Sequence, residues 1–201
     1  MQQYIDFHTH HASLRGERVI QDGVDTRGRH PWHLTVADET ASEQAPGPTE
    51  AETAEGILAI GESGLDRLCN TPYDLQQRIF RDEVAQSERL HLPLFLHCVR
   101  AIDDVLNLRR ELRARQSWIW HGYRGGAEQL HQLLAHGFYF SFGLRFRDEA
   151  LRQCPLDRLL LETDDDTARP IADHYAEAAR LRGIAVDEFL LQMHTNFAAL
   201  F

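Results

Sequence analysis

The chain contains 201 residues with a mass of 23.1 kDa, and 43% of them are hydrophobic, so residues 1–201 are predicted to form a single domain with one sizeable core. Its 31 acidic and 21 basic residues give a formal net charge of −10, which argues against a nucleic-acid binder that relies on a broad basic surface. No apolar run approaches the ~20 residues of a membrane-spanning helix, and the N-terminus lacks a basic region followed by an apolar stretch, so neither membrane insertion nor secretion is predicted.

Two further features of the composition narrow the chemistry. The three cysteines, Cys69, Cys98 and Cys154, are odd in number and widely spaced, which argues against a disulfide framework and predicts a reducing compartment, the cytoplasm. All 21 basic residues are arginine. The absence of lysine excludes a Schiff-base lysine, a phosphate-loop lysine and a carbamylated lysine between two metals. Any protein ligand that bridges two metal ions must therefore be a carboxylate.

Short apolar segments alternate along the chain with longer segments of helical periodicity. Candidate strands cover residues 4–8, 18–21, 57–61, 93–97, 117–121, 138–142 and 158–162, and candidate helices cover 72–90, 101–114, 126–136, 170–182 and 187–199. This alternation is typical of βαβ units with a parallel sheet, and the apolar character of the strands indicates that both faces of the sheet are covered.

Two segments show local signals. Residues 72–90 form the clearest helix, because Thr71 supplies a capping residue and Pro72 can occupy the first helical position. Residues 36–56 contain six acidic residues, no basic residue and the turn signal Pro46-Gly47-Pro48, which predicts a surface excursion with room for one short helix.

Several predicted strands end in a residue type that binds metal ions. In chain order these residues are His8 and His10, Glu62, His97, His121 and Asp164. In parallel α/β folds, and in (β/α) barrels above all, the active site forms at the carboxyl ends of the strands. The six side chains are therefore expected to converge on one site.

Each of these residues also has a structural interpretation. His8 and His10 share one face of a strand, so both imidazoles can reach one cation, but an isolated pair of this kind can also be two partly buried structural histidines. Glu62 alone could be a solvated carboxylate, His97 and His121 could bond to backbone, and Asp164 has two acidic neighbours. Because all six lie at strand ends, a metal site is favoured.

The residue types also constrain the metal and the reaction. Four imidazoles with two carboxylates favour one or two divalent ions of zinc, manganese or iron, with magnesium as the less suited alternative because it prefers an oxygen shell. Such a site supplies metal-bound hydroxide near neutral pH and neutralises charge on an oxyanion. The reaction class is therefore hydrolysis, but these residues alone do not distinguish a phosphodiester from an amide or an amidine.

Six ordered motifs resemble those of the TatD family of metal-dependent hydrolases between Asp6 and Asp166: DFHTHH, GRHPWHL, AIGESGLDRL, PLFLHCVRA, WIWHGYRGG and LLLETDDD. The closing HTNFAALF is similar to the C-terminal helix of that family. The resemblance implies a (β/α) barrel of the TIM type, divalent metal ions, and phosphodiesterase activity as a DNase or 3′-exonuclease. The implied substrate is a nucleic acid or a small phosphate ester, with neither a membrane nor an obligate protein partner.

The resemblance also implies roles for individual residues. His8 and His10 would bind one metal ion with Asp164, which is also a candidate proton acceptor. Glu62 would bridge to a second ion, and His97 and His121 would complete that second site. The substrate side would include His30, in the GRHP turn, and Arg100, whose guanidinium fork suits a phosphate oxygen.

Three departures from the family pattern are visible. Asp6 to Pro31 span only 26 residues, which is short for the segment between the first two motifs, so the barrel is predicted to be shortened or distorted, with about seven strands. Arg124 stands where a small residue often follows the histidine–aromatic motif. Asp165 and Asp166 replace the usual proline. These departures predict a compact subgroup with an altered substrate pocket.

Two other functions remain open at this point. The first is an amidohydrolase-like enzyme that cleaves a C–N or carboxylic ester bond, since it shares the strand-end histidines, and the missing lysine excludes only carbamate-bridged members. The second is a scaffold or binding protein that has lost catalysis, against which the retention of all six ligand types argues.

Overall fold

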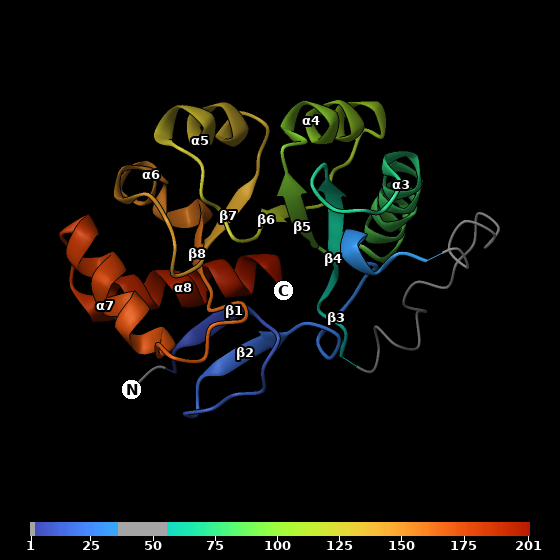
Figure 1. Cartoon of the computed structure of the whole chain (residues 1–201). Coiled ribbons are helices and arrows are strands. Elements are labelled where there is room, and N and C mark those ends of the chain that lie inside the picture. Colours follow the sequence, from blue (N-terminus) through green and yellow to red (C-terminus); the bar gives the residue numbers. More distant parts are fainter. Residues whose placement is uncertain (1–2, 36–55) are drawn as a thin grey trace. The chain divides into compact units, whose positions relative to one another are not determined.

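The computed structural model describes residues 3–35 and 56–201, and the predicted surface excursion at 36–56 lies, except for Gly56, outside the described residues (Figure 1). The chain divides into two compact units, which we call the terminal unit (Met1–Asp22 with Ile119–Phe201) and the central unit (Gly23–Trp118). The prediction of a single domain over 1–201 stays a prediction.

The terminal unit combines both ends of the sequence. Its elements are β1 (Ile5–Thr9), β2 (Arg18–Gln21), β6 (Trp118–Trp120, of which Trp118 belongs to the central unit), α5 (Ala127–Leu134), β7 (Tyr139–Phe142), α6 (Asp148–Gln153), η2 (Leu156–Arg158), β8 (Leu159–Leu161), α7 (Ile171–Arg182) and α8 (Val186–Leu200). β1 pairs with β2, and β7 pairs with both β6 and β8, all in parallel. β1 and β8 are buried throughout, as expected for strands covered on both faces.

Helices α7 and α8 pack against each other and lie beside β8 (Figure 1). The buried Asn196 in α8 donates two hydrogen bonds, to the carbonyl groups of Leu156 (2.7 Å) and Leu159 (2.8 Å), which ties the helix to the start of β8. Tyr175 in α7 is fully buried and its hydroxyl donates to the Ile5 carbonyl at 2.9 Å. The C-terminal helix that the closing motif predicted is therefore present and fixes the carboxyl-terminal strand.

The central unit contains β3 (Thr26–Arg27), η1 (Pro31–His33), β4 (Ala59–Asp66), α3 (Tyr73–Leu90), β5 (Leu94–Val99) and α4 (Ile102–Glu111). Strands β3, β4 and β5 are adjacent and parallel, and α3 packs against β4. The apolar face of α3 buries Ile79, Phe80 and Val84. The centre of the Phe80 ring lies 5.4 Å from the centre of the buried Trp118 ring. Burial of such rings dominates the stability of a small core.

The seven predicted strands correspond to β1, β2 and β4–β8, and the five predicted helices to α3, α4, α5, α7 and α8. Two details were predicted wrongly. β4 continues to Asp66 rather than ending at residue 61, with a shift of register between Ile60 and Ser63. Helix α3 begins at Tyr73 after Pro72, and the Thr71 hydroxyl donates to the Pro31 carbonyl at 2.6 Å instead of capping the helix.

Gly64 explains how β4 can continue. Its backbone has a φ of +156°, and a Cβ atom there would lie 1.9 Å from the carbonyl oxygen of His97 on β5. Only glycine allows this approach, so the residue marks close packing of two strands rather than a turn.

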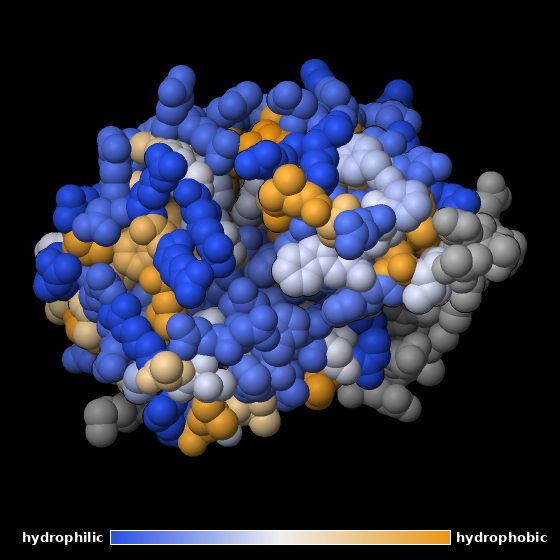
Figure 2. Space-filling view, viewed as in Figure 1, coloured by the Kyte–Doolittle hydropathy of each residue, from blue (hydrophilic) through white to orange (hydrophobic). Residues whose placement is uncertain are grey.

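Hydrophilic residues cover most of the face shown in Figure 2, and apolar residues are scattered over it. Among the described residues, the large apolar side chains that are more than half exposed are Leu14, Val24, Trp32, Leu68 and Leu191.

No helix in the described part of the chain is long and apolar enough to cross a membrane. Cys69, Cys98 and Cys154 are all free thiols.

His174 provides a prediction about the pH dependence of stability. Its ring is fully buried in α7 and Nε2 donates to the Phe142 carbonyl at 2.8 Å; burial lowers the pKa of this histidine below its ordinary 6.5. Below pH 6.5 the unfolded chain therefore takes up a proton that the folded chain excludes, and the free energy of unfolding should fall as pH falls, by up to about 1.4 kcal/mol per pH unit from this group. Urea unfolding should be measured between pH 7 and pH 5. The free energy of unfolding of His174→Gln should fall less steeply with falling pH than that of the unmodified protein. Equal slopes in the two proteins would contradict the assignment.

Candidate metal centre

Three side chains of the terminal unit meet at the end of β1, and we call them the His8 group: His8, His10 and Asp164. Thr9 and Asp164 form a parallel β-bridge, in which the Asp164 amide donates to the His8 carbonyl at 3.0 Å and the His10 amide donates to the Asp164 carbonyl at 3.3 Å. The Asp164 Oδ1 atom consequently lies 3.9 Å from His8 Nε2 and 3.4 Å from His10 Nε2. One ligand atom from each residue lies within 4.8 Å of the other two.

Asp164 has an unusual backbone, with a φ of +58°. This left-handed conformation is uncommon for residues other than glycine, although aspartate tolerates it better than most. It occurs three residues after the end of β8, where the chain makes the bridge to Thr9. Backbone strain of this kind persists where the surroundings hold the residue in place, and here the hydrogen bonds to β1 do so.

The His8 group has two further carboxylates around it. Glu162 is fully buried, its Oε1 accepts a hydrogen bond from the Gly122 amide at 2.6 Å, and the same atom lies 3.4 Å from His121 Nδ1. The His121 ring lies 4.6 Å from the His8 ring, and Asp22 Oδ2 lies 3.7 Å from His10 Nδ1. Carboxylates that face the second nitrogen of a ligating histidine orient the ring and raise its basicity. Glu162 and Asp22 suit that role.

Asp6 connects β1 to the segment after β8. It is buried, and its carboxylate accepts hydrogen bonds from the amide (3.0 Å) and hydroxyl (2.6 Å) of Thr163. Burial raises the pKa of this carboxyl to about 7, although both bonds from Thr163 act in the opposite direction. Thr163 is thus held between Asp6 and the candidate ligand Asp164, which fixes the approach of β8 to β1.

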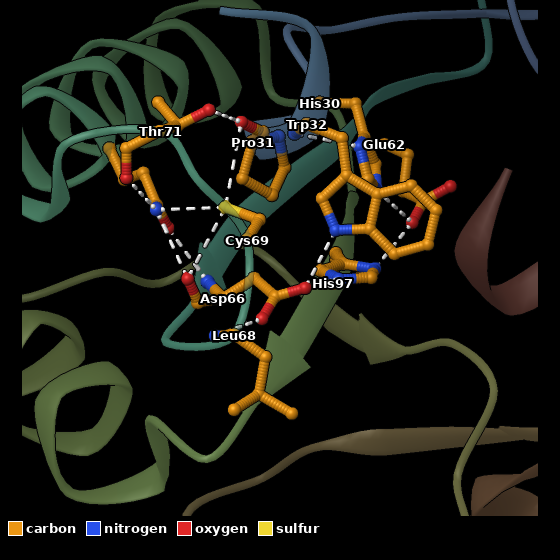
Figure 3. Close-up of polar contacts among 10 residues, drawn as sticks. His30, Pro31, Trp32, Glu62, Asp66, Leu68, Cys69, Thr71 and His97 are labelled. Atoms are coloured by element: carbon orange, nitrogen blue, oxygen red, sulfur yellow. Dashed lines mark hydrogen bonds and ion pairs between the residues drawn. The ribbon is translucent and has the colours of Figure 1, made fainter.

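Three side chains of the central unit form the Glu62 group: His30, Glu62 and His97 (Figure 3). The single Glu62 Oε1 atom lies 3.0 Å from His30 Nε2 and 2.8 Å from His97 Nδ1. His30 precedes Pro31, the first residue of η1, and its Nδ1 accepts a hydrogen bond from the Trp32 amide at 3.1 Å. That bond leaves Nε2 to face Glu62.

Asp66 supports the Glu62 group from the end of β4. Its Oδ2 lies 3.2 Å from His97 Nε2 and accepts from the Trp32 indole N–H at 2.6 Å, and its Oδ1 accepts from the Leu68 amide at 2.7 Å (Figure 3). Burial alone would raise the pKa of this carboxyl, but the hydrogen bonds from Trp32, Leu68 and His97 outweigh it and lower the pKa below the ordinary value. Asp66 is therefore an ionised partner of the His97 ring.

Gln76 in α3 fixes the backbone beneath Asp66. Its Oε1 accepts from the Asp66 amide at 2.7 Å, and its Nε2 donates to the carbonyl groups of Asp66 (3.0 Å) and Thr71 (2.9 Å). The Thr71 hydroxyl in turn donates to Pro31. This network joins the end of β4, the start of α3 and the turn that carries His30.

The chemistry of both groups fits a divalent metal ion. Each offers two imidazole nitrogens and one carboxylate oxygen within 4.8 Å of one another. This donor set suits zinc, manganese or iron better than magnesium. His121, assigned by resemblance to the second site, lies beside His8 and Glu162 within the terminal unit. The bridge by Glu62 stays a prediction.

The remaining predicted residue, Arg100, is exposed directly after β5, three residues beyond His97, with a backbone φ of +53°. Its role on the substrate side stays a prediction. Asp22, Asp66 and Glu162 are the carboxylate partners of the histidines that the sequence did not indicate. The signal was available, because Glu62 and Asp66 share a face if β4 continues past Gly61, and Glu162 closes an apolar strand one residue before Thr163-Asp164.

A pocket of about 440 Å³ lies beside the His8 group in the terminal unit. It is lined by residues that follow β6, β7 and β8, among them Arg124, Arg145, Glu162 and Asp164. Both arginine side chains are exposed, and neither forms an ion pair with any described carboxylate. The pocket therefore places two available guanidinium groups near the His8 group.

Comparisons with known proteins identify the family of this chain. A sequence model of the family described as TatD related DNase matches residues 5–201. An uncharacterised metal-dependent hydrolase of Bacillus subtilis, YabD, is 33% identical over 142 residues, which cover 66% of this chain and 56% of that protein. The chain thus spans little more than half the length of that relative. A 3′-5′ ssDNA/RNA exonuclease, TatD of Erwinia amylovora, is 32% identical over 204 residues, covering 88% of this chain and 77% of that one.

A solved structure supports the fold. The crystal structure of a TatD-family hydrolase from Entamoeba histolytica superposes with a TM-score of 0.76 at 17% identity, covering 100% of this chain and 98% of the other. This likeness concerns the fold alone, and it confirms the predicted α/β architecture of the TIM-barrel type, with parallel strands alternating with helices. The family is shown by the sequence comparisons: the match over residues 5–201 and the 32% identity to the Erwinia protein show that the chain belongs to the TatD family of metal-dependent hydrolases.

Proposed function

We propose that this chain is a divalent-metal-dependent phosphodiesterase that acts as a nuclease on single-stranded nucleic acid. The observation that carries the proposal is the pocket in which Arg124 and Arg145 lie beside the His8 group. A guanidinium group presents a planar fork of donors that matches the oxygens of a phosphate. A neutral amide or carboxylic ester offers no anionic group for two arginines to bind.

The His8 and Glu62 groups would each hold a divalent ion, with zinc or manganese favoured by the imidazole content. When bound, such an ion lowers the pKa of a coordinated water and neutralises charge that develops on a phosphoryl oxygen. The protein's own residues then have distinct tasks. Arg124 and Arg145 bind and orient the phosphate, with Arg100 as a further candidate, and Asp164 accepts the proton of the attacking water.

The net charge of −10 is compatible with a nucleic-acid substrate of this kind. Non-specific nucleic-acid binders depend on a broad basic surface, whereas a nuclease needs positive charge only where the phosphate sits, and bound metal ions with two arginines supply it. The name of the Erwinia relative, an exonuclease for single-stranded DNA and RNA, supports this substrate class.

Metal removal tests the proposal directly. Purified protein with measured metal content should release nucleotides from a single-stranded oligonucleotide, lose this activity in a chelator, and regain it with Mn²⁺ or Zn²⁺. The same preparation should be tested on a panel of phosphodiesters, amides and lactones. A folded protein with full metal occupancy that hydrolyses an amide or lactone but no phosphodiester would overturn the proposal in favour of an amidohydrolase.

A double variant of Arg124 and Arg145 tests whether this pocket binds the phosphate. Replacing both Arg124 and Arg145 by alanine removes two charged hydrogen-bonding groups, each worth about 1.5–3 kcal/mol, so kcat/KM for the oligonucleotide should fall by at least about 100-fold while metal content is unchanged. Arg152→Ala, at an exposed arginine of α6 outside the pocket, is the matched control. Equal effects of the two changes would argue against phosphate binding in this pocket.

A further inference from the structure

Trp32 is an exposed aromatic side chain next to the Glu62 group. Its relative exposure is 59%, whereas Trp118 and Trp120 are 0% and 5% exposed. Among the large apolar side chains that the structure describes as exposed, it is the one aromatic residue. Leaving an indole in water forgoes the stabilisation that its burial would provide, so a fixed exposed tryptophan calls for a reason other than packing.

The indole ring is held in place by groups of the metal centre. Its N–H donates to Asp66 at 2.6 Å, and the backbone amide of Trp32 donates to His30 Nδ1. The centre of the indole ring lies 5.0 Å from the centre of the His30 ring, with an angle of 86° between the ring planes. For the His97 ring the distance is 5.6 Å and the angle is 78° (Figure 3). The orientation of the ring is thus set before any substrate binds, which removes the entropic penalty of ordering it on binding.

The flat faces of the indole are not used in stacking by either histidine. Because both imidazole planes stand nearly perpendicular to the indole plane, neither ring lies flat against it. Leu68, which is 61% exposed and whose amide donates to the same Asp66 carboxylate, adds a second apolar side chain to this face of the central unit. A planar aromatic ligand is the chemical partner that such a surface fits.

We infer that Trp32 is a stacking platform for one unpaired nucleobase of the substrate, next to the Glu62 group. This inference rests on the proposed nuclease function and adds to it the side chain that positions a base of the single strand. Stacking on an aromatic ring requires a base whose face is accessible, which favours single strands and tolerates any base, since all four have a π-face. Trp32 thereby positions the base and takes no part in the hydrolysis of the phosphodiester.

Kinetics with two matched oligonucleotides test the inference. One carries bases and the other has abasic tetrahydrofuran units throughout. Trp32→Ala should raise KM for the base-containing oligonucleotide by about 10- to 100-fold and change kcat little, because stacking on an aromatic side chain contributes about that much to binding. KM for the abasic oligonucleotide should be unchanged. Trp32→Phe should restore much of the lost affinity, and Leu191→Ala, at an exposed apolar residue of α8, is the control.

Fluorescence separates a failure of this inference from a failure of the proposed function. Since Trp118 and Trp120 are buried, dAMP should quench the emission of Trp32 in particular, and this quenching should vanish in Trp32→Phe even if the protein cleaves no phosphodiester. Equal loss of activity on the base-containing and abasic substrates, or a fall in kcat at constant KM, would overturn the inference and assign Trp32 to the support of Asp66. Absence of quenching by dAMP in the unmodified protein would overturn it as well.

Discussion

Replacing Glu62 by glutamine is expected to lower phosphodiester hydrolysis by about 10³-fold, because removal of a ligand charge forfeits several kcal/mol of transition-state stabilisation, and each 1.4 kcal/mol is worth a factor of ten. The single Oε1 atom faces both His30 and His97, so the change affects all contacts of the Glu62 group at once. The measurements are kcat/KM on a single-stranded oligonucleotide and the metal content of the variant by atomic absorption.

Glu111→Gln is the matched control for this prediction. Glu111 is an exposed glutamate of α4 that pairs with Arg81, outside both metal groups. It should keep full activity and full metal content. A Glu62→Gln protein that binds metal and hydrolyses substrate as well as this control would remove Glu62 from the metal centre.

Asp66→Asn should lower the metal affinity of the Glu62 group. Asparagine keeps the shape and one acceptor oxygen, but it loses the negative charge that faces His97 Nε2 and accepts from Trp32. Loss of such a partner of a ligating histidine typically lowers metal affinity by about 10- to 100-fold. Isothermal titration with Zn²⁺ and Mn²⁺ should show this decrease, and saturating metal should restore most of the activity.

Asp104→Asn controls for the loss of a hydrogen-bonded carboxylate in the same unit. Asp104 accepts from Tyr73 and Arg67 and contacts no residue of the Glu62 group. If both variants bind metal with equal affinity, Asp66 supports the fold and not the metal. The unfolding midpoint measured in chelator shows how much of any change is purely structural.

The convergence of the His8 group could be predicted from the sequence. His8, His10 and Asp164 were expected to meet because parallel strands end at the same edge, and the Thr9–Asp164 bridge brings them together. Apolar segments precede these residues in the sequence, and such segments predict strands. The fold class followed from the same regular alternation of strands and helices.

The position of Asp66 beside the Glu62 group was harder to predict from the sequence. Gly61 and Gly64 are residues typical of a turn, so the sequence predicts that the strand ends at Gly61 and indicates no role for Asp66. In the structure β4 continues past both glycines, and a Cβ atom at Gly61 or Gly64 would lie 2.6 Å or 1.9 Å from a carbonyl oxygen of β5. A close backbone approach depends on the neighbouring strand, which local sequence does not reveal. The short elements β3 and α6 were missed because two and six residues carry too little periodicity.

The division of the chain into a continuous and a discontinuous unit has a consequence for the order of assembly. The ligands of the Glu62 group lie between residues 30 and 97, inside the uninterrupted central unit. The His8 group instead joins residues 8 and 10 to residue 164. During synthesis the two N-terminal histidines therefore leave the ribosome long before their carboxylate partner exists, and closing so long a loop is slow. The nascent protein therefore completes one set of candidate metal ligands well ahead of the other, because Asp164 follows His97 by 67 residues.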